Sequence, residues 1–312
     1  MWTSIDNSLC ELGESPFWHP RERALYWLDI PGRAVLRTRG EIGTPSATVE
    51  RWALSTEPGC MAPARSGGLV IALRDGIYRA REWGGELVAI ARVEHDVRTM
   101  RFNDGKCDAL GRFWSGSINE AKDRANAALY CLDARPGRGA APAALAQMAN
   151  QVTTANGLAF SPDARTLYWA DTPAHQVRAW DWDAEANTLS QPRVFRQFDA
   201  KPEGWTPDSP MLRYAGRPDG ATVDAQGHYW VAMFEGAQLL RLAPSGETVA
   251  AVPVPAQCPT MPCFGGDDLK TLFVTTARKG RPAAEIERLP ASGTVVSMRV
   301  DTPGLPVAFF ED

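Results

Sequence analysis

One short pattern recurs along this chain and constrains its fold more than any other feature. An apolar residue and a turn are followed by a strand with an aromatic or β-branched pair, as in Trp18-His19-Pro20 before Tyr26-Trp27. Clear copies span residues 18–27, 107–114, 160–169 and 223–230, and weaker copies span 64–71 and 264–273. Six copies in 312 residues give about 52 residues for each, which is typical of a repeat architecture.

Each copy is predicted to be a β-hairpin, because Pro-Asp, Gly and Asp-Ala-x-Gly clusters supply the turns. Short strands at 177–180 and 239–242 follow two of the hairpins. Four short strands per copy and little helical periodicity predict an all-β fold, a six-bladed β-propeller with four-stranded antiparallel blades. We expect a single domain over residues 1–312. The best helical candidate, residues 140–148, is interpreted as a loop or a single helical run.

Aligning the copies also aligns one position on the innermost strand of every blade, four residues before the apolar residue that opens each hairpin. The residues at this position are Glu14, Cys60, Asn103, Asn156, Asp219 and Thr260. Equivalent positions of a propeller form a ring around one mouth of the central channel, so four oxygen-bearing side chains are expected to meet there. Carboxylate and amide oxygens are ligands of hard divalent cations. The alternative is that each of these residues only shapes a turn.

Composition excludes several classes of protein. Charged residues make up 22% and apolar residues 44% of the chain, and the formal net charge is −4, so a disordered chain is excluded. The absence of Lys/Arg blocks argues against a nucleic-acid partner. No apolar run reaches the roughly 20 residues that span a bilayer, which argues against a membrane protein. The first residues lack the pattern of a secretory signal, so we expect a cytoplasmic protein whose six cysteines are free, mostly buried thiols.

Four segments carry a likeness that extends from about residue 10 to about residue 276. They are Gly-Glu-Ser-Pro at 13–16, Arg-Phe-Asn-Asp-Gly-Lys-Cys-Asp at 101–108, Asn-Gly-Leu-Ala-Phe-Ser-Pro-Asp at 156–163 and Pro-Asp-Gly at 218–220. In these segments the chain resembles the regucalcin/gluconolactonase (senescence marker protein) family. The resemblance implies a six-bladed propeller that holds one divalent metal at the channel mouth and hydrolyses sugar lactones.

The resemblance also implies roles for individual residues. The metal ligands would be Glu14, Asn156 and Asp219, while Arg101 and Asn103 would contact the substrate. An acidic residue after the Trp114 strand contributes to substrate binding in some relatives, and Glu120 is its candidate here. The stretch 117–121 departs from the usual family pattern, which leaves the sugar open. The cofactor would be one divalent ion, Ca²⁺ first, with Zn²⁺, Mn²⁺, Mg²⁺ or Fe²⁺ as alternatives.

A mechanism follows as a hypothesis. A lactone is a cyclic ester, and its hydrolysis by water passes through a tetrahedral oxyanion that a divalent cation can stabilise. Asp219 is the candidate acceptor of the proton of the attacking water. Arg101 lies two residues before Asn103 on the same face of the strand, so it could supply a permanent positive charge. The expected partner is a small-molecule sugar lactone in oxidative sugar catabolism, and the expected assembly is a monomer or weak homo-oligomer.

Two other functions remain open at this stage. One is a propeller that hydrolyses phosphotriesters or other lactones, and the other is a non-catalytic propeller that binds calcium or a protein partner. The sequence has no Gly-x-Ser-x-Gly, so a serine-esterase nucleophile elbow is unsupported. The Pro/Gly-rich stretch 199–217 is interpreted either as a lid or pocket wall or as a plain connection between blades.

Overall fold

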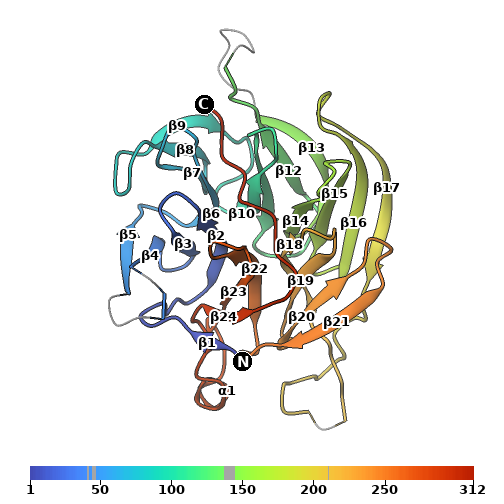
Figure 1. The fold of residues 1–312 in the computed structure, drawn as a ribbon. Coiled ribbons are helices and arrows are strands. Elements are labelled where there is room, and N and C mark those ends of the chain that lie inside the picture. The colour runs from blue at the N-terminus through green and yellow to red at the C-terminus, as the bar shows by residue number, and fades with distance from the viewer. Residues whose placement is uncertain (41, 44–46, 137–144, 210) are drawn as a thin grey trace.

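The computed structural model describes residues 1–312 except 41, 44–46, 137–144 and 210. The described residues form six antiparallel sheets of four strands each, arranged as blades around a central channel (Figure 1). The innermost strands are β2 (Gly13–His19), β6 (Pro58–Pro63), β10 (Met100–Cys107), β14 (Ala155–Phe160), β18 (Arg217–Val223) and β22 (Pro259–Gly265). The predicted six-bladed propeller with four-stranded antiparallel blades is confirmed.

The remaining strands follow outward in chain order within the blades. Second strands are β3 (Ala24–Asp29), β7 (Leu69–Leu73), β11 (Phe113–Asn119), β15 (Thr166–Asp171), β19 (Tyr229–Phe234) and β23 (Thr271–Thr276). Third strands are β4 (Ala34–Arg39), β8 (Gly76–Ala80), β12 (Ala127–Leu132), β16 (Gln176–Asp183), β20 (Gln238–Leu242) and β24 (Val296–Arg299). Outer strands are β5 (Thr48–Ala53), β9 (Val88–Arg92), β13 (Leu145–Val152), β17 (Thr188–Gln197), β21 (Thr248–Pro253) and β1 (Thr3–Ser4).

The sixth blade joins the two ends of the described chain. Its strand order is β1-β24-β23-β22, so its outer strand comes from the N-terminus, where Thr3 pairs with Ser297. The short helix α1 (Ala283–Arg288) lies between β23 and β24. Neither feature was predicted, because a two-residue strand and a six-residue helix are too short to leave a periodic pattern.

The core lies between the blades. Six clusters of buried apolar side chains fill the six gaps between neighbouring blades. Trp27 and Trp114 are 0% exposed, and Trp169 and Trp230 are 1% and 5% exposed. These aromatic strand residues form the blade-to-blade contacts that hold the inner strands in register around the channel, as large apolar side chains do in a packed core.

Residues 140–148 correct one expectation. Residues 140–144 lie outside the described residues, and 145–148 begin the outer strand β13 instead of a loop or helical run. Leu145 pairs with Leu132 and Ala146 with Cys131, so the alanine-rich stretch is extended by pairing with β12. Tertiary pairing overrides the helical propensity of alanine here. All six cysteines are free and buried, as expected.

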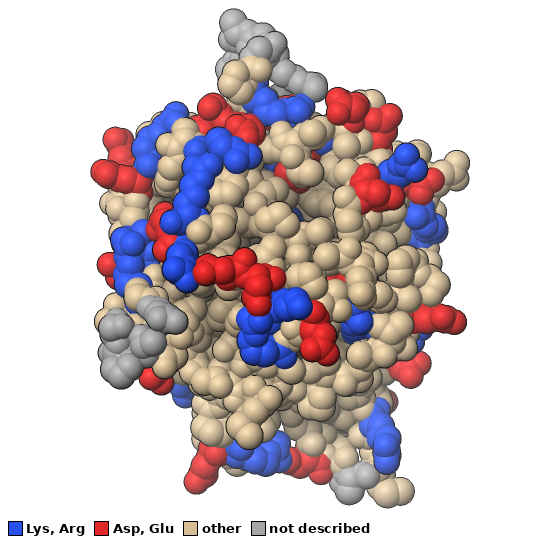
Figure 2. Space-filling view, viewed as in Figure 1, with Lys and Arg blue, Asp and Glu red and all other residues tan. Residues whose placement is uncertain are grey.

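The two faces of the ring differ. At the far ends of the inner strands, the C-terminal segment crosses the channel, where Gly304 pairs with Asp224 and Phe310 with Ala64 (Figure 1). Residues 305–309 help to line a cavity of about 590 Å³ in this part of the channel. Figure 2, in the same view, shows basic and acidic side chains interspersed over the visible face. Among the described residues, no helix has the length and apolar character needed to cross a membrane.

Candidate functional site

The six aligned positions lie on the six innermost strands, near the end at which each strand begins. This end is opposite the C-terminal segment, and we call it the mouth of the channel. Glu14, Asn103, Asn156 and Asp219 are all buried there, with exposed fractions of 8%, 8%, 4% and 6%. The structure therefore brings the predicted oxygen-bearing residues to the same end of the channel.

A break in strand register accompanies the ring position in every blade. The pairing of each inner strand with the second strand shifts by one residue beside this position, for example between Phe102 and Gly105 in β10. Such β-bulges re-aim side chains and are common beside active sites. In β14 the bulge includes Gly157, whose φ is 58° and where an added Cβ would lie 2.3 Å from the Tyr229 hydroxyl. The same irregularity therefore marks the ring position in all six blades.

A chain of hydrogen bonds links blades 3, 4 and 5 across the mouth. The Arg101 guanidinium donates to Asn103 Oδ1 at 2.8 Å, and Asn103 Nδ2 donates to Asn156 Oδ1 at 2.7 Å. Asn156 Nδ2 donates to Thr172 Oγ1 at 2.7 Å, and that hydroxyl donates to the Pro218 carbonyl at 2.8 Å. Each donor has a partner, so the chain fixes which way both amide groups point while Asn156 Oδ1 keeps acceptor capacity.

Three buried carboxyl groups, those of Glu14, Asp104 and Asp219, lie near enough to shift one another's pKa. Burial and the charges of Asp219 and Asp104 hold the pKa of Glu14 well above its usual range. Burial and the charge of Asp104 likewise raise the pKa of Asp219 to about 8, although Arg217 and Lys122 oppose this. Within the described part of the chain, none of the three carboxyls has an ion-pair partner.

The third carboxyl, Asp104, was quoted in the sequence motif without a role. Its Oδ2 accepts a hydrogen bond from the Leu158 backbone amide at 2.9 Å, whereas its buried Oδ1 has no partner. Burial raises its pKa, and the charge of Lys106 opposes the shift. An unpartnered buried carboxylate oxygen costs free energy. A cation at the mouth would offset part of this cost by acting on all three carboxyls.

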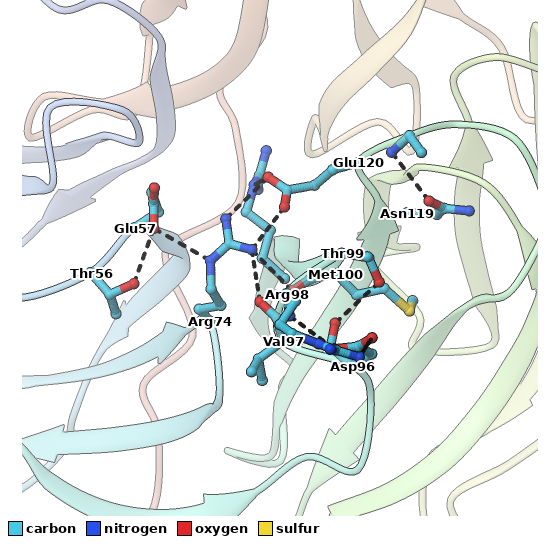
Figure 3. Close-up of polar contacts among 12 residues, drawn as sticks. Thr56, Glu57, Arg74, Asp96, Val97, Arg98, Thr99, Met100, Asn119 and Glu120 are labelled. Carbon is cyan, nitrogen blue, oxygen red and sulfur yellow. Dashed lines mark hydrogen bonds and ion pairs between the residues drawn. The ribbon is translucent and has the colours of Figure 1, made fainter.

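Glu120 is committed to two arginines at the rim of the mouth. It accepts hydrogen bonds from Arg74 at 2.7 and 3.1 Å, and its Oε1 lies 3.6 Å from Arg101 Nε. Figure 3 shows Arg74 between Glu120 and Glu57, whose Oε2 lies 3.4 Å from Arg74 Nε. The alternating charges hold Arg101 in place beside Asn103, and they lower the pKa of Glu120, chiefly through its hydrogen bond to Arg74.

The two remaining ring positions serve packing. Cys60 and Thr260 are 0% exposed. The Cys60 thiol lies 3.1 Å from Ser115 Oγ, and Thr260 Oγ1 donates to the Gly13 carbonyl at 2.6 Å. Both side chains are therefore satisfied by neighbouring protein atoms, unlike the carboxyls of the other positions.

The long connection before Asp219 approaches the mouth through aromatic and charged contacts. Tyr214 lies against Trp205, with ring centroids 5.1 Å apart, and its hydroxyl is 2.6 Å from His175 Nε2. Lys201 binds Glu235 at 2.9 Å. Residues 198–216 form no strand in the part that the structure describes, and Arg217 already belongs to β18. Whether the stretch 199–217 is a lid or pocket wall or a plain connection between blades stays a prediction.

The donor set fits a hard divalent cation. Two carboxylates and an amide oxygen suit such an ion, and the unpaired charge at the mouth favours one. The described residues contain no group of three or more His, Cys, Asp and Glu side chains arranged to share a metal ion. Any ligand set here must therefore combine two carboxylates with an amide, as in Glu14, Asn156 and Asp219, and leave further positions open.

The sequence analysis missed Thr172, which links Asn156 to blade 5. Thr172 follows the second strand of blade 4, outside the aligned inner strands, so the repeat gave it no position. Asp104 carried a detectable signal, because it follows Asn103 directly within the quoted motif.

Comparison with known proteins places these residues in a family. The family model described as "SMP-30/Gluconolactonase/LRE-like region" matches residues 12–278. A 6-deoxy-6-sulfogluconolactonase of Pseudomonas putida is 37% identical over 96% of this chain and 94% of its own length. The regucalcin of Danio rerio is 34% identical over 91% of this chain and 88% of its own length.

A solved structure supports the fold. The calcium-binding protein regucalcin from Agrobacterium tumefaciens superposes with a TM-score of 0.84 and covers 99% of this chain and 97% of its own. Its sequence identity is 24%, so the likeness concerns the architecture.

Proposed function

This chain belongs to the SMP-30/gluconolactonase/LRE-like family as a sugar lactonase, and we propose that it opens aldono-lactones at the channel mouth with one divalent cation. The observation that carries the proposal is the pairing of Glu14 and Asp219, two buried carboxyls without a cationic partner among the described residues, beside the oriented amide of Asn156. Burying carboxyl groups without a cationic partner costs free energy, and a bound cation would offset this cost.

Glu14, Asn156 and Asp219 would hold the cation. When bound, a divalent cation polarises an ester carbonyl and offsets the negative charge that develops on its oxygen. Its charge also favours the ionised forms of Glu14 and Asp219, against the burial that raises their pKa values. Ca²⁺ is our first candidate, since it takes carboxylate and amide oxygens as ligands.

The substrate would be oriented by the hydrogen-bonded pair of Arg101 and Asn103. Arg101 is buried, and its contacts with Asn103 and Glu120 fix its direction. A fixed guanidinium binds a carbonyl or hydroxyl oxygen of the lactone without losing rotamer entropy at the moment of binding. Glu120 would contribute by holding Arg101 and by accepting a hydrogen bond from a sugar hydroxyl.

Asp219 would accept the proton of the attacking water. Its carboxylate lies at the mouth, buried and within reach of the charges of Arg217 and Lys122. A base in this position removes a proton as the water oxygen adds to the lactone carbonyl, and that proton then passes to the ring oxygen as its bond to the carbonyl carbon breaks, which gives the open-chain hydroxy acid. The net reaction consumes one water and releases one proton from the acid that forms.

The direct test is a panel of five- and six-membered aldono-lactones, followed by proton release with and without Ca²⁺, Mn²⁺, Mg²⁺ or Zn²⁺. Each assay starts from protein stripped by chelation. We expect hydrolysis of at least one lactone that depends on added metal. Failure to open any lactone with every metal would contradict the proposal and favour a non-catalytic binding propeller.

Substitution of Asp219 tests the site itself. We expect Asp219→Ala and Asp219→Asn to lower kcat/KM by about 10³-fold, because both remove the proton acceptor and the negative charge beside the cation, and Asp219→Ala also removes a metal ligand. Thr260→Val is a matched control on the same ring, at a position satisfied by protein atoms. Full activity of Asp219→Ala in metal-replete buffer would overturn the mechanism.

A further inference from the structure

A second arginine occupies the position that Arg101 holds in its own blade. Arg101 lies two residues before the ring residue Asn103, and Arg217 lies two residues before the ring residue Asp219. In the other four blades this position is held by Leu12, Pro58, Thr154 and Cys258. Blades 3 and 5 flank blade 4, so the two arginines approach the mouth from either side of Asn156.

Arg217 belongs to a cluster with more positive than negative charge. Its guanidinium lies 2.8 Å from Glu235, and the same carboxylate binds Lys201 at 2.9 Å and Arg281 at 3.2 Å. Arg281 has one further partner, Glu285. Three cations therefore share two carboxylates, and Arg217 has no second acidic partner among the described residues. By contrast, Arg101 and Arg74 at the opposite rim are balanced by Glu120 and Glu57.

Lys122 adds a cation at the mouth end of blade 3. It lies in the turn after β11, where its backbone amide donates to the Asn119 carbonyl at 3.0 Å and its φ is 55°. The Asn119 side chain binds Asp123 at 2.8 Å and the Arg124 carbonyl at 3.1 Å, so this turn is held in one shape.

The ammonium of Lys122 is available to a ligand. It has no hydrogen-bond or ion-pair partner in the part of the chain that the structure describes. Partial desolvation and the charges of Arg217 and Arg101 lower its pKa, whereas Asp219 and Glu235 oppose the shift. The end of β11 pairs with the start of β10, so Lys122 follows β11 at the mouth end of blade 3, and Arg217 opens the inner strand of blade 5 at the same end.

We propose that Arg217 and Lys122 form a subsite for an anionic substituent of the substrate, so that the preferred sugar lactones carry a second acidic group. The inference rests on the proposed lactonase function and specifies its substrate class. The lactone carbonyl would lie toward Arg101 and Asn103, and the anionic group would lie toward blade 5. A carboxylate, phosphate or sulfonate at the far carbon of the sugar shares the required chemistry, because each offers several oxygen acceptors to a guanidinium and an ammonium.

Charge balance supports an anion at this place. The excess positive charge of the Arg217 cluster is not paired with protein carboxylates. Glu14 and Asp219 are not available for this pairing, because their negative charges would neutralise the charge of the bound divalent cation. A neutral sugar would leave Lys122 and the excess of the Arg217 cluster without a counter-charge. An acidic sugar would supply one, and charge-assisted contacts are stronger than neutral ones.

The test compares four lactones with the wild-type protein loaded with metal. One is neutral glucono-lactone, and the others carry a carboxylate, a phosphate or a sulfonate at the far carbon. We expect kcat/KM for at least one acidic lactone to exceed that for the neutral lactone by about tenfold or more, mainly through KM. This preference should weaken as ionic strength rises. The acidic lactone with the highest kcat/KM relative to the neutral lactone identifies the anionic group that the subsite prefers.

Variants assign the preference to residues. Lys122→Met should reduce the ratio of acidic to neutral kcat/KM by about tenfold, which corresponds to ~1.4 kcal/mol. Arg217→Gln should reduce it further, and Arg217→Lys should restore part of it. Lys270→Met, at the turn between β22 and β23 on the far face, is the matched control and should leave the ratio as in the wild type. Melting temperatures identify any variant that is merely unfolded, and Lys122→Met removes no contact between described residues.

A binding measurement provides a readout that does not depend on turnover. The open-chain acids of the same four sugars are titrated by calorimetry into wild-type and Lys122→Met protein. The extra affinity for the doubly acidic product should be lost in the variant. Equal use of neutral and acidic lactones, or an acidic preference that both variants retain, would overturn the subsite while leaving the lactonase intact. If none of the four lactones is opened, the proposed function itself has failed.

Discussion

The two ends of the channel treat charge in opposite ways. At the far end, the guanidinium of Arg79 is 3% exposed and is saturated by protein, with Asp312 at 2.9 Å, Ser66 at 2.8 Å and the Gly67 carbonyl at 2.6 Å. At the mouth, Glu14 and Asp219 are nearly as buried and have no cationic partner among the described residues. A buried charge that has protein partners, such as that of Arg79, stabilises the fold. Buried carboxyls without such partners, such as Glu14 and Asp219, indicate a site for a ligand.

The largest effect is expected from removing a carboxylate at the mouth. Glu14→Gln keeps the shape of the side chain and removes one of two carboxylates from the proposed metal site. We expect kcat/KM to fall by about 10³-fold, close to 4 kcal/mol of transition-state stabilisation. The free energy of unfolding in chelator should stay the same or rise, because a buried carboxyl without a partner has been removed. Parallel lactone assays and denaturant titrations test both halves, and a large loss of stability would contradict the comparison.

The next largest effect is expected from removing the buried ion pair between Arg79 and Asp312 at the far end. Arg79→Met leaves the Asp312 carboxylate without its most buried partner, and we expect the free energy of unfolding to fall by about 3 kcal/mol with kcat/KM close to that of the wild type. Arg81→Met is the matched control, because Arg81 lies 2.9 Å from the same carboxylate but its side chain is 70% exposed. Its loss should cost at most about 1 kcal/mol. Comparable losses in both variants would show that burial does not set the strength of the Asp312 contacts.

Removal of metal should destabilise the protein through the mouth alone. A ligand bound only to the folded state at 100 times its Kd adds about 2.7 kcal/mol, and EDTA should remove this amount. The shift in melting temperature on chelation should disappear in Glu14→Gln and persist in Arg79→Met. An unchanged melting temperature in the wild type would argue against a well-occupied metal site.

A smaller effect sharpens the comparison within the mouth. Thr172→Val cuts the hydrogen-bond chain between Asn156 and the Pro218 carbonyl, leaving Asn156 Nδ2 without its acceptor. We expect kcat/KM to fall by about tenfold, since the loss of one buried hydrogen bond costs about 1 to 1.5 kcal/mol. Thr172→Ser keeps the hydroxyl and should restore activity. If Thr172→Val and Thr172→Ser behave alike, the chain does not orient Asn156.

The smallest effect concerns pH at the far end. Burial alone would raise the pKa of the Asp312 carboxyl, but its contacts with Arg79, Ser66 and Arg81 lower it overall. A carboxyl with a lowered pKa in the folded state adds stability above its unfolded pKa of about 3.9, and this stability is lost as pH falls through the folded value. The destabilisation by Arg79→Met should therefore be constant between pH 8 and pH 5 and shrink below pH 4. Denaturant titrations of both proteins across this range provide the check.

Most of the architecture could be predicted from spacing. Turn residues and aromatic strand residues recur in each blade, and the recurrence places Glu14, Asn103, Asn156 and Asp219 at equivalent positions on inner strands. Arg217 was given no role in the sequence analysis, although it precedes Asp219 by two residues as Arg101 precedes Asn103. Repetition makes such positions readable, since one local pattern is repeated with one geometry.

Contacts between distant segments had no such signal. Thr3 and Ser4 complete the sixth blade, Thr172 reaches the Pro218 carbonyl, and Asp312 meets Arg79 across 233 residues. Residues 145–148 became a strand because β12 offered a partner, against the preference of alanine. The sequence of one segment does not show which backbone groups of a distant segment are free to pair with it.

The sequence by itself determined the number of blades, the inner strands and the residue types that face the mouth, because these depend on local turn chemistry and alternation that recur along the chain. Only the tertiary structure decided how the ring closes, which polar groups find protein partners and which buried charges stay unpaired. Those outcomes depend on the distances between atoms that lie far apart in the chain. Burial strengthens each polar contact that forms and raises the free-energy cost of each polar group left without a partner.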